Sequence, residues 1–203
     1  MDLRVSGGPV SELTVSDYLQ QVASDRPVPG GGSAAALAGA LGAALLAMVA
    51  RVSMKRAKGA EIQAELEVLA PEGDRLVDRL LQLAQDDIDA YAAVVQARRS
   101  LREQTGDESA FRVAAEGAAR VPLSTATLAR RGLDMLDQLR PLASPLVASD
   151  VDTAQGLLRA AFDGALANVA INLPDLEPAA QVQLRKAYEA LRAAGPRPSH
   201  RPG

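Results

Sequence analysis

One aspartate lies in the middle of a predicted apolar helix face, and its position suggests chemistry. Asp87 belongs to the acidic run Asp86-Asp87-Ile88-Asp89. At 100° per residue it falls among apolar side chains, whereas Asp86 and Asp89 point to the other side. The apolar face comprises Leu76, Val77, Leu80, Leu83, Ala84, Tyr91 and Val94. Burying a carboxylate is costly unless it is paired or protonated. A salt bridge, a cap on a neighbouring helix, and a catalytic or substrate-binding role all remain open for Asp87.

Two asparagines continue the apolar stripe of a later predicted helix. Asn168 and Asn172 follow Ala165 at i+3 and i+7, so both amides are expected to face the interior. Each amide could orient the polar atoms of a ligand. For Asn172, which closely precedes Pro174, the alternative is a structural role at the end of the helix.

A glycine-rich turn precedes another predicted helix. Pro27-Val28-Pro29-Gly30-Gly31-Gly32 cannot be helical, and Ser33 is the N-cap candidate. Such a turn presents free N–H groups and the positive end of the helix dipole to an anion or a carbonyl. No Walker lysine and no preceding strand accompany it, so a nucleotide fold is not indicated. The alternative interpretation is a flexible corner between helices.

Composition excludes several kinds of chemistry. Cysteine is absent and the single histidine is His200, which excludes disulfides, cysteine nucleophiles, Ser-His-Asp triads and the usual zinc sites. We therefore expect no metal site. The net charge of −3 argues against a nucleic-acid partner.

The chain is also expected to act away from membranes. The apolar stretch 34–50 is shorter than the roughly 20 residues that a bilayer requires. No basic region followed by an apolar core opens the sequence, so we expect a cytoplasmic location.

The elements that must position these side chains are predicted to be helical throughout. Ala and Leu dominate and aromatic residues make up 2% of the chain, which favours one all-α domain over 1–203, a bundle of five to seven helices. The expected helices are 16–23, 34–55, 60–99 with a bend near Pro71, 108–139 with a kink or break at Pro122, 151–172 capped by Ser149 or Asp150, and 178–194. Residues 196–203 are expected to be a disordered tail. Helix 34–55 is small on every side, which is typical of a central core helix, a subunit interface, or both.

These segments together resemble a known family. The matching residues are Val15 to Leu19, Ala23-Ser24, Pro27, Pro29 to Ala34, Gly39-Ala40, Ala47 to Ala50, Asp87, Ala90-Tyr91, Ala118 to Pro122, Ala148-Ser149-Asp150, Asn168-Val169 and Asn172-Leu173. In that order, over about 15–175, they resemble the formiminotetrahydrofolate cyclodeaminase and methenyltetrahydrofolate cyclohydrolase family.

The resemblance implies a helical homodimer that acts on a tetrahydrofolate with a glutamate tail. Cyclodeaminases form the methenyl cation between N5 and N10 with loss of ammonia, and cyclohydrolases open it with water. Neither reaction requires a metal or a redox cofactor. The resemblance does not choose between the two reactions.

The resemblance also implies roles for particular residues. Asp87 and Asp150 are candidates for acid/base catalysis or for binding the pterin edge. The substrate-binding candidates are Gly30, Gly31, Gly32, Ser33, Tyr91, Ser149, Asn168, Asn172 and, with Arg56 and Lys58 for the glutamate tail, Lys55.

One segment departs from the family pattern. Before Ser149 the family usually carries an asparagine-containing turn, whereas this chain has Ala143-Ser144-Pro145-Leu146-Val147. That difference predicts the loss of a binding contact. It keeps open a non-catalytic folate-binding or regulatory module, and a purely structural helical adaptor is the third hypothesis.

Overall fold

The computed structural model describes residues 7–195 and confirms an all-α fold. In that range there are six α-helices and four 3-10 turns, and no strand. The elements are η1 (Val10–Glu12), α1 (Val15–Val22), α2 (Gly31–Met54), α3 (Ala60–Arg102), α4 (Glu108–Leu139), η2 (Arg140–Leu142), η3 (Pro145–Val147), α5 (Ala148–Asn172), η4 (Leu173–Asp175) and α6 (Pro178–Ala193). His200 and the predicted tail lie outside the described residues.

Two helices begin three residues earlier than predicted. α2 starts at Gly31, so Ser33 lies inside its first turn and is not the N-cap. α5 starts at Ala148, which places Ser149 and Asp150 in its first turn, and their predicted capping role was wrong. In both cases the preceding turn leads directly into the helix.

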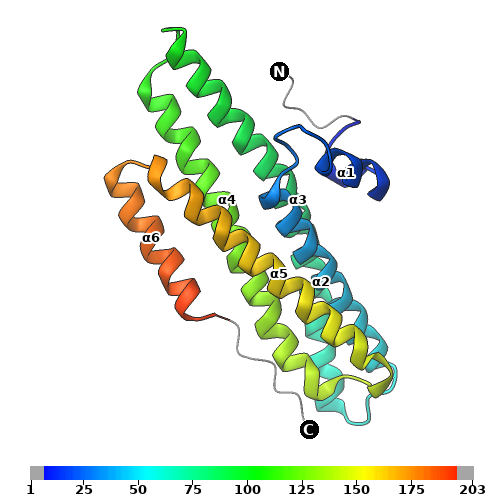
Figure 1. Ribbon diagram of the computed structural model, residues 1–203. Helices are drawn as coiled ribbons and strands as arrows, with labels where there is room; N and C mark the ends of the chain where they lie inside the picture. Colours follow the sequence, from blue (N-terminus) through cyan, green and yellow to red (C-terminus); the bar gives the residue numbers. More distant parts are fainter. Residues whose placement is uncertain (1–6, 196–203) are drawn as a thin grey trace.

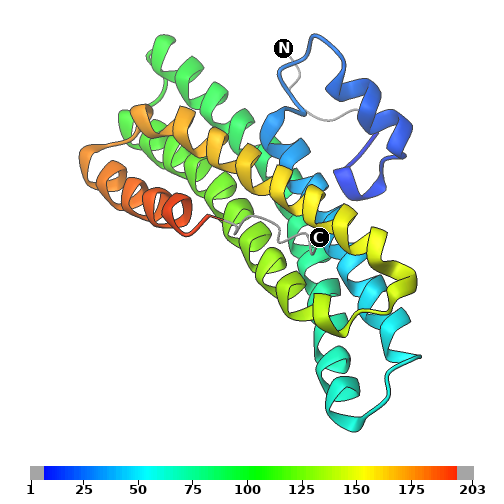
Figure 2. The ribbon, with the colours of Figure 1, turned by 60° about the horizontal axis from the view of Figure 1, so that its bottom comes forward.

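Helices α2 to α5 run side by side in an elongated bundle, with α2 packed mainly against α3 and α5 (Figures 1 and 2). The small side chains of α2 permit this close packing. Ala36, Ala43 and Ala50 are completely buried. The predicted core role of this helix is therefore confirmed. By length and composition alone α2 could also cross a membrane, but 61% of its most apolar window is buried inside the bundle, as expected for a core helix.

Two prolines lie within helices without breaking them. α3 continues through Pro71 and α4 continues through Pro122, so the predicted break at Pro122 does not occur. Pro71 is exposed, so water can satisfy the carbonyl that its missing N–H leaves free. Pro122 is buried, and its carbonyl needs a partner from the protein.

Unequal helix lengths open a space inside the bundle. α3 has 43 residues and α2 has 24, which correspond to about 65 Å and 36 Å at 1.5 Å per residue. The first turn of α2 meets α3 near Asp87, close to the middle of the longer helix. Beyond that point α3, α4 and the end of α5 continue without α2 between them (Figure 1).

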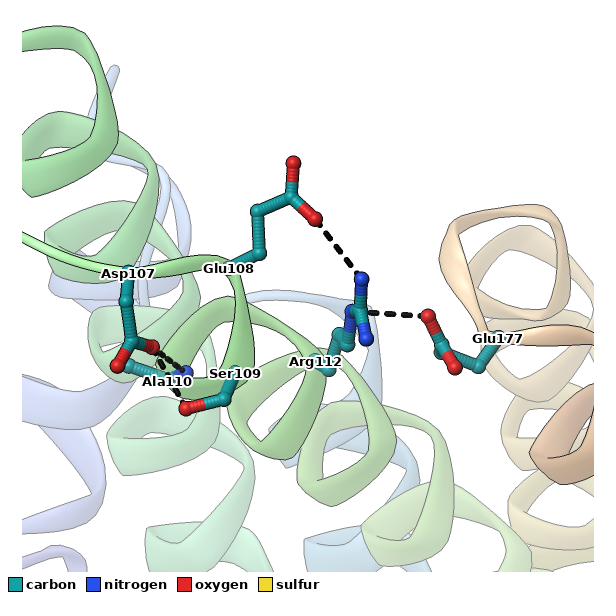
Figure 3. Close-up of polar contacts among 6 residues, drawn as sticks. All are labelled: Asp107, Glu108, Ser109, Ala110, Arg112 and Glu177. Carbon is teal, nitrogen blue, oxygen red and sulfur yellow. Dashed lines mark hydrogen bonds and ion pairs between the residues drawn. The ribbon is translucent and has the colours of Figure 1, made fainter.

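The far end of α4 is held by polar contacts, drawn in Figure 3. Asp107 caps the helix by accepting from the N–H of Ala110 at 2.9 Å. Arg112 contacts Glu108 on its own helix and Glu177, just before α6, at 2.8 Å each. These ion pairs are exposed and contribute little. A small apolar cluster instead holds α6 to α4 and α5, and it contains Ala115, Ala119, Val169, Leu173, Leu176 and Leu184.

Two glycines test the close packing of α2. A Cβ on Gly42 would lie 2.8 Å from Leu158 Cγ and 3.1 Å from the carbonyl oxygen of Ala154, which is backbone of α5. Gly42→Ala should therefore destabilise the fold by about 1 to 3 kcal/mol. Exposed Gly156, in α5, has nothing within 4 Å of such a Cβ. Gly156→Ala should raise stability by about 0.5 to 1 kcal/mol. Thermal unfolding followed by circular dichroism measures both changes, and equal effects would contradict the packing.

Candidate active site

The space beyond the first turn of α2 is a pocket of about 370 Å³. Its volume lies in the range of small-molecule sites. It is lined by Pro27, Val28, Gly30, Gly31, Gly32, Asp87, Tyr91, Val94, Val95, Arg98, Ala118, Asn168, Ile171, Asn172 and Asp175. Most of the residues that the sequence singled out therefore meet at one site, although they come from three separate helices.

Asp87 lies directly against the backbone of Gly32. A Cβ on Gly32 would be 2.0 Å from Asp87 Oδ1, so no side chain larger than hydrogen fits there while Asp87 keeps its place. The other carboxylate oxygen, Oδ2, accepts a hydrogen bond from the N–H of Ser33 at 2.9 Å. Asp87 thus caps the first turn of α2 from a neighbouring helix.

The electrostatic state of Asp87 follows from these contacts. Burial raises the pKa of the Asp87 carboxyl above its ordinary value, and the hydrogen bond from Ser33 lowers it by a smaller amount. Among residues 7–195 no cation forms an ion pair with Asp87, so the salt-bridge interpretation is wrong for the described chain. A carboxyl with a raised pKa in a pocket is suited to proton transfer.

A second layer supports this carboxyl from α1. Tyr18 Oη and Ser33 Oγ share a hydrogen bond of 3.0 Å, and both residues are buried. Burial raises the pKa of Tyr18, and the negative charge of Asp87 raises it further, while the bond to Ser33 lowers it. Tyr18 was recognised in the sequence only as part of an amphipathic helix. Its role behind the site depends on a tertiary contact.

The start of α2 supplies hydrogen-bond donors to the pocket. The N–H groups of Gly31 and Gly32 belong to the first turn, where a helix has no internal acceptors. Neither N–H has a partner within the described part of the chain. Together with the helix dipole they favour a carbonyl or a developing negative oxygen.

Asn172 has a structural task that explains its position. Pro122 lacks an N–H, so the carbonyl of Ala118, four residues earlier in α4, has lost its normal donor. Asn172 Nδ2 donates to that carbonyl oxygen at 2.9 Å. The amide of α5 thereby compensates for the proline of α4, and its oxygen is still able to accept from a ligand.

Asn168 is also oriented by a backbone contact. Its Nδ2 donates to the carbonyl oxygen of Gly164 at 2.8 Å, one turn earlier in α5. A Cβ on Gly31 would lie 3.4 Å from the same nitrogen, so the amide sits beside the start of α2. Asn168 therefore presents a fixed polar group next to the free N–H donors.

The wall of the pocket changes character away from Asp87. Tyr91, Val94 and Val95 from α3 face Ile171 from α5, and Tyr91 and Ile171 are 41% and 75% exposed. Beyond them lies the ion pair of Arg98 with Asp175. Arg98, Asp175 and Ile171 were missed in the sequence. The available signal was the spacing 87, 91, 94, 98, which keeps these residues on one helix face.

Three predicted site residues lie elsewhere in the chain. Lys55 caps the opposite end of α2, and Ser149 and Asp150 lie at the opposite end of α5. Each is separated from the pocket by most of the length of its helix, so a single chain does not bring them to the site. Arg56 and Lys58 instead line another surface hollow, of about 530 Å³, with the turn Ala143 to Leu146.

The divergent turn is therefore remote from the pocket of its own chain. It forms η3 and is held by the N–H of Ser144, which donates to Ser53 Oγ at 2.9 Å. No group of three or more His, Cys, Asp or Glu side chains within residues 7–195 is placed to hold a metal ion.

Comparison with known proteins places this arrangement in a family. The sequence model of the formiminotransferase-cyclodeaminase family matches residues 14–190. The methenyltetrahydrofolate cyclohydrolase of Methylorubrum extorquens is 32% identical over 186 residues, which cover 89% of each protein. The formimidoyltransferase-cyclodeaminase of Mus musculus is 31% identical over 170 residues, and the match covers 81% of this chain and 31% of the mouse protein.

A solved structure agrees with these sequence matches. The formiminotetrahydrofolate cyclodeaminase of Thermotoga maritima superimposes with a TM-score of 0.83 at 27% identity, over 91% of this chain and 90% of that protein. The resemblance seen in the sequence is confirmed.

The raised pKa of Asp87 predicts a pH-dependent effect on stability. An acid whose pKa is higher in the folded state stabilises the fold fully below its unfolded pKa of about 4, and this contribution is lost as the pH rises through the folded pKa. Asn has no proton to lose and still accepts from Ser33. The thermal midpoint of Asp87→Asn, relative to wild type, should therefore increase from pH 4 to pH 8.

A matched control is Asp89→Asn, which removes an exposed carboxylate from the same helix and should show a smaller change. If Asp87→Asn lost stability relative to wild type as the pH rose, Asp87 would have a cationic partner and our assignment of its environment would be wrong.

Proposed function

Because the chain belongs to the formiminotransferase-cyclodeaminase family, we propose that the pocket beside Asp87 converts the one-carbon unit between N5 and N10 of tetrahydrofolate. The chain is an enzyme of one-carbon folate metabolism, of the cyclodeaminase or cyclohydrolase kind. The observation that carries the site assignment is the protonatable carboxyl of Asp87, which faces a pocket beside two unpaired backbone donors.

Both family reactions require one proton transfer at the same carbon. In the hydrolase direction water adds to the methenyl carbon, the bond from that carbon to one ring nitrogen breaks, and the sum is methenyl cation plus water giving formyl-tetrahydrofolate plus a proton. In the deaminase direction N10 attacks the formimino carbon and ammonia leaves. That sum is formimino-tetrahydrofolate plus a proton giving the methenyl cation plus ammonia.

Asp87 suits either transfer. As a carboxylate it would accept the proton of the attacking water and stabilise the cation, and as the acid it would protonate the departing amine. Burial brings the two forms closer in population at neutral pH because it raises the pKa. The N–H groups of Gly31 and Gly32 would bind an oxygen that becomes negative during hydrolysis.

The remaining polar groups would position the substrate. The amide oxygens of Asn168 and Asn172 can accept from ring N–H groups, since their nitrogens already donate to carbonyls. The methenyl carbon is electrophilic without assistance, so the proposed reactions require no metal or redox cofactor. We also retain a cytoplasmic location as part of the proposal.

The experiment is direct. Purified protein is incubated with 5,10-methenyltetrahydrofolate, whose near-ultraviolet absorbance falls as the ring opens, and separately with 5-formiminotetrahydrofolate, from which ammonia is measured. We expect turnover of at least one compound, and ammonia release decides which reaction the enzyme performs. Absorbance loss no faster than in buffer, together with no ammonia, would contradict the proposed function.

In the same assay Asp87→Asn should lower turnover at least about a hundredfold, the usual scale of one acid/base group. Asp89→Asn, on the outer face of the same helix, is the control and should retain turnover. Near-normal turnover by folded Asp87→Asn protein would remove Asp87 from the mechanism.

We further propose that the active form is a homodimer, as the family resemblance implies. Exposed apolar side chains support this proposal, since Val15 and Leu19 on α1 are 78% and 58% exposed and Leu41 on α2 is 55% exposed. A second copy could cover them symmetrically. Light scattering at micromolar concentration should give twice the chain mass of 21.1 kDa. A monomer mass at every concentration would refute the dimer.

A further inference from the structure

We propose that Arg98 binds the carboxylates of the substrate's glutamate tail and thereby sets the direction in which a folate lies in the pocket. This inference rests on the proposed function and concerns the same site. It replaces Lys55, Arg56 and Lys58, which lie at the other end of α2, in the role that the sequence suggested for them.

The first observation is the order of side chains along one face of α3. Asp87, Tyr91, Val94 and Arg98 all line the pocket. At 100° per residue they lie within about 40° of one another around the helix axis. Arg98 follows Asp87 by eleven positions, which corresponds to about 16 Å along the axis. The pocket therefore changes from acidic to aromatic and apolar, and then to cationic, in a straight line.

The proposed substrate has the same order of chemical groups. Its methenyl bridge is a cation, the p-aminobenzoyl ring follows, and the glutamate carboxylates end the molecule. Asp87 attracts the cationic end and repels carboxylates, whereas Arg98 is the one cation among the pocket-lining residues. Charge complementarity therefore favours one orientation, with the methenyl bridge at Asp87.

The second observation is that Arg98 is held in place although its side chain is 45% exposed. Its guanidinium carbon lies 5.4 Å from the centre of the Phe111 ring in α4, within the range of a cation–π contact. Its Nη2 also contacts Asp175 Oδ2, in η4. Contacts from two other elements thus fix a side chain that would otherwise be mobile, which lowers the entropy lost on binding.

The third observation is that the guanidinium retains free donors. An arginine has five N–H donors in a planar fork. Only Nη2 of Arg98 is used, and its Nε and Nη1 have no partner within the described residues. A substrate carboxylate can therefore bind the free edge while the contact with Asp175 persists. An exposed ion pair alone would contribute little to the fold.

The test compares two ligands that differ only in the tail. Calorimetry measures binding of 5-formyltetrahydrofolate and of the matching 5-formyltetrahydropteroate, which lacks glutamate. Wild type should bind the glutamate-bearing compound about ten- to a hundredfold more tightly, the scale of a charge-assisted contact. In Arg98→Ala this preference should fall to nearly one, and Arg98→Lys should retain part of it, because the charge remains but the fork is lost.

Arg99→Ala is the matched control. Arg99 is the next residue of α3, points away from the pocket and pairs with Glu103 at 2.8 Å. This variant should keep the full preference. The inference is overturned if Arg98→Ala keeps the wild-type preference, if it weakens both ligands equally, or if Arg99→Ala loses the preference to the same extent.

Turnover of methenyltetrahydrofolate, measured on the same proteins, separates this inference from the proposed function. A preference that depends on Arg98 without any turnover would sustain the tail site and refute the enzyme. Turnover without such a preference would do the reverse, and no binding of either ligand by wild type would overturn the tail site.

Discussion

The contact between the Asp87 carboxylate and the bare backbone of Gly32 is the constraint on which the rest of the site depends. An acidic side chain placed there removes water from one side of the carboxyl and raises its pKa. The same contact requires glycine in the first turn of α2 and leaves two N–H groups of that turn free. One interaction thus joins two helices, prepares a proton donor or acceptor, and exposes donors beside it.

The pocket exists because the bundle is uneven. α2 ends where α3 is only half complete, and the helices that continue enclose space that a longer α2 would fill. Such space inside a bundle would normally be unfavourable, since polar backbone becomes accessible without partners. Here side chains of α5 compensate, and the bond from Asn172 to the carbonyl left free by Pro122 is the clearest case. Stability and ligand binding therefore use the same residues.

Several features were predictable because helical periodicity carries them. The composition of small and aliphatic residues predicts the all-α bundle, and the stripe around Asp87 correctly predicts a carboxylate turned inward. The amides at Asn168 and Asn172 were located by the same arithmetic. The salt-bridge alternative for Asp87 and the break at Pro122 were wrong, because each depends on which partner a neighbouring helix supplies, and one helix considered alone contains no such information.

The sequence by itself thus determined the class of fold, the inward face of each helix and the family, since these follow from local periodicity and from residue order. Only the tertiary structure decided which end of each helix belongs to the site. Lys55 and Asp150 carry suitable chemistry, but they lie a helix length from Asp87, whereas Arg98 and Asp175 come from distant parts of the chain and meet at the pocket. Helix packing joins residues by position along the bundle axis, and that register depends on how neighbouring helices fit against one another.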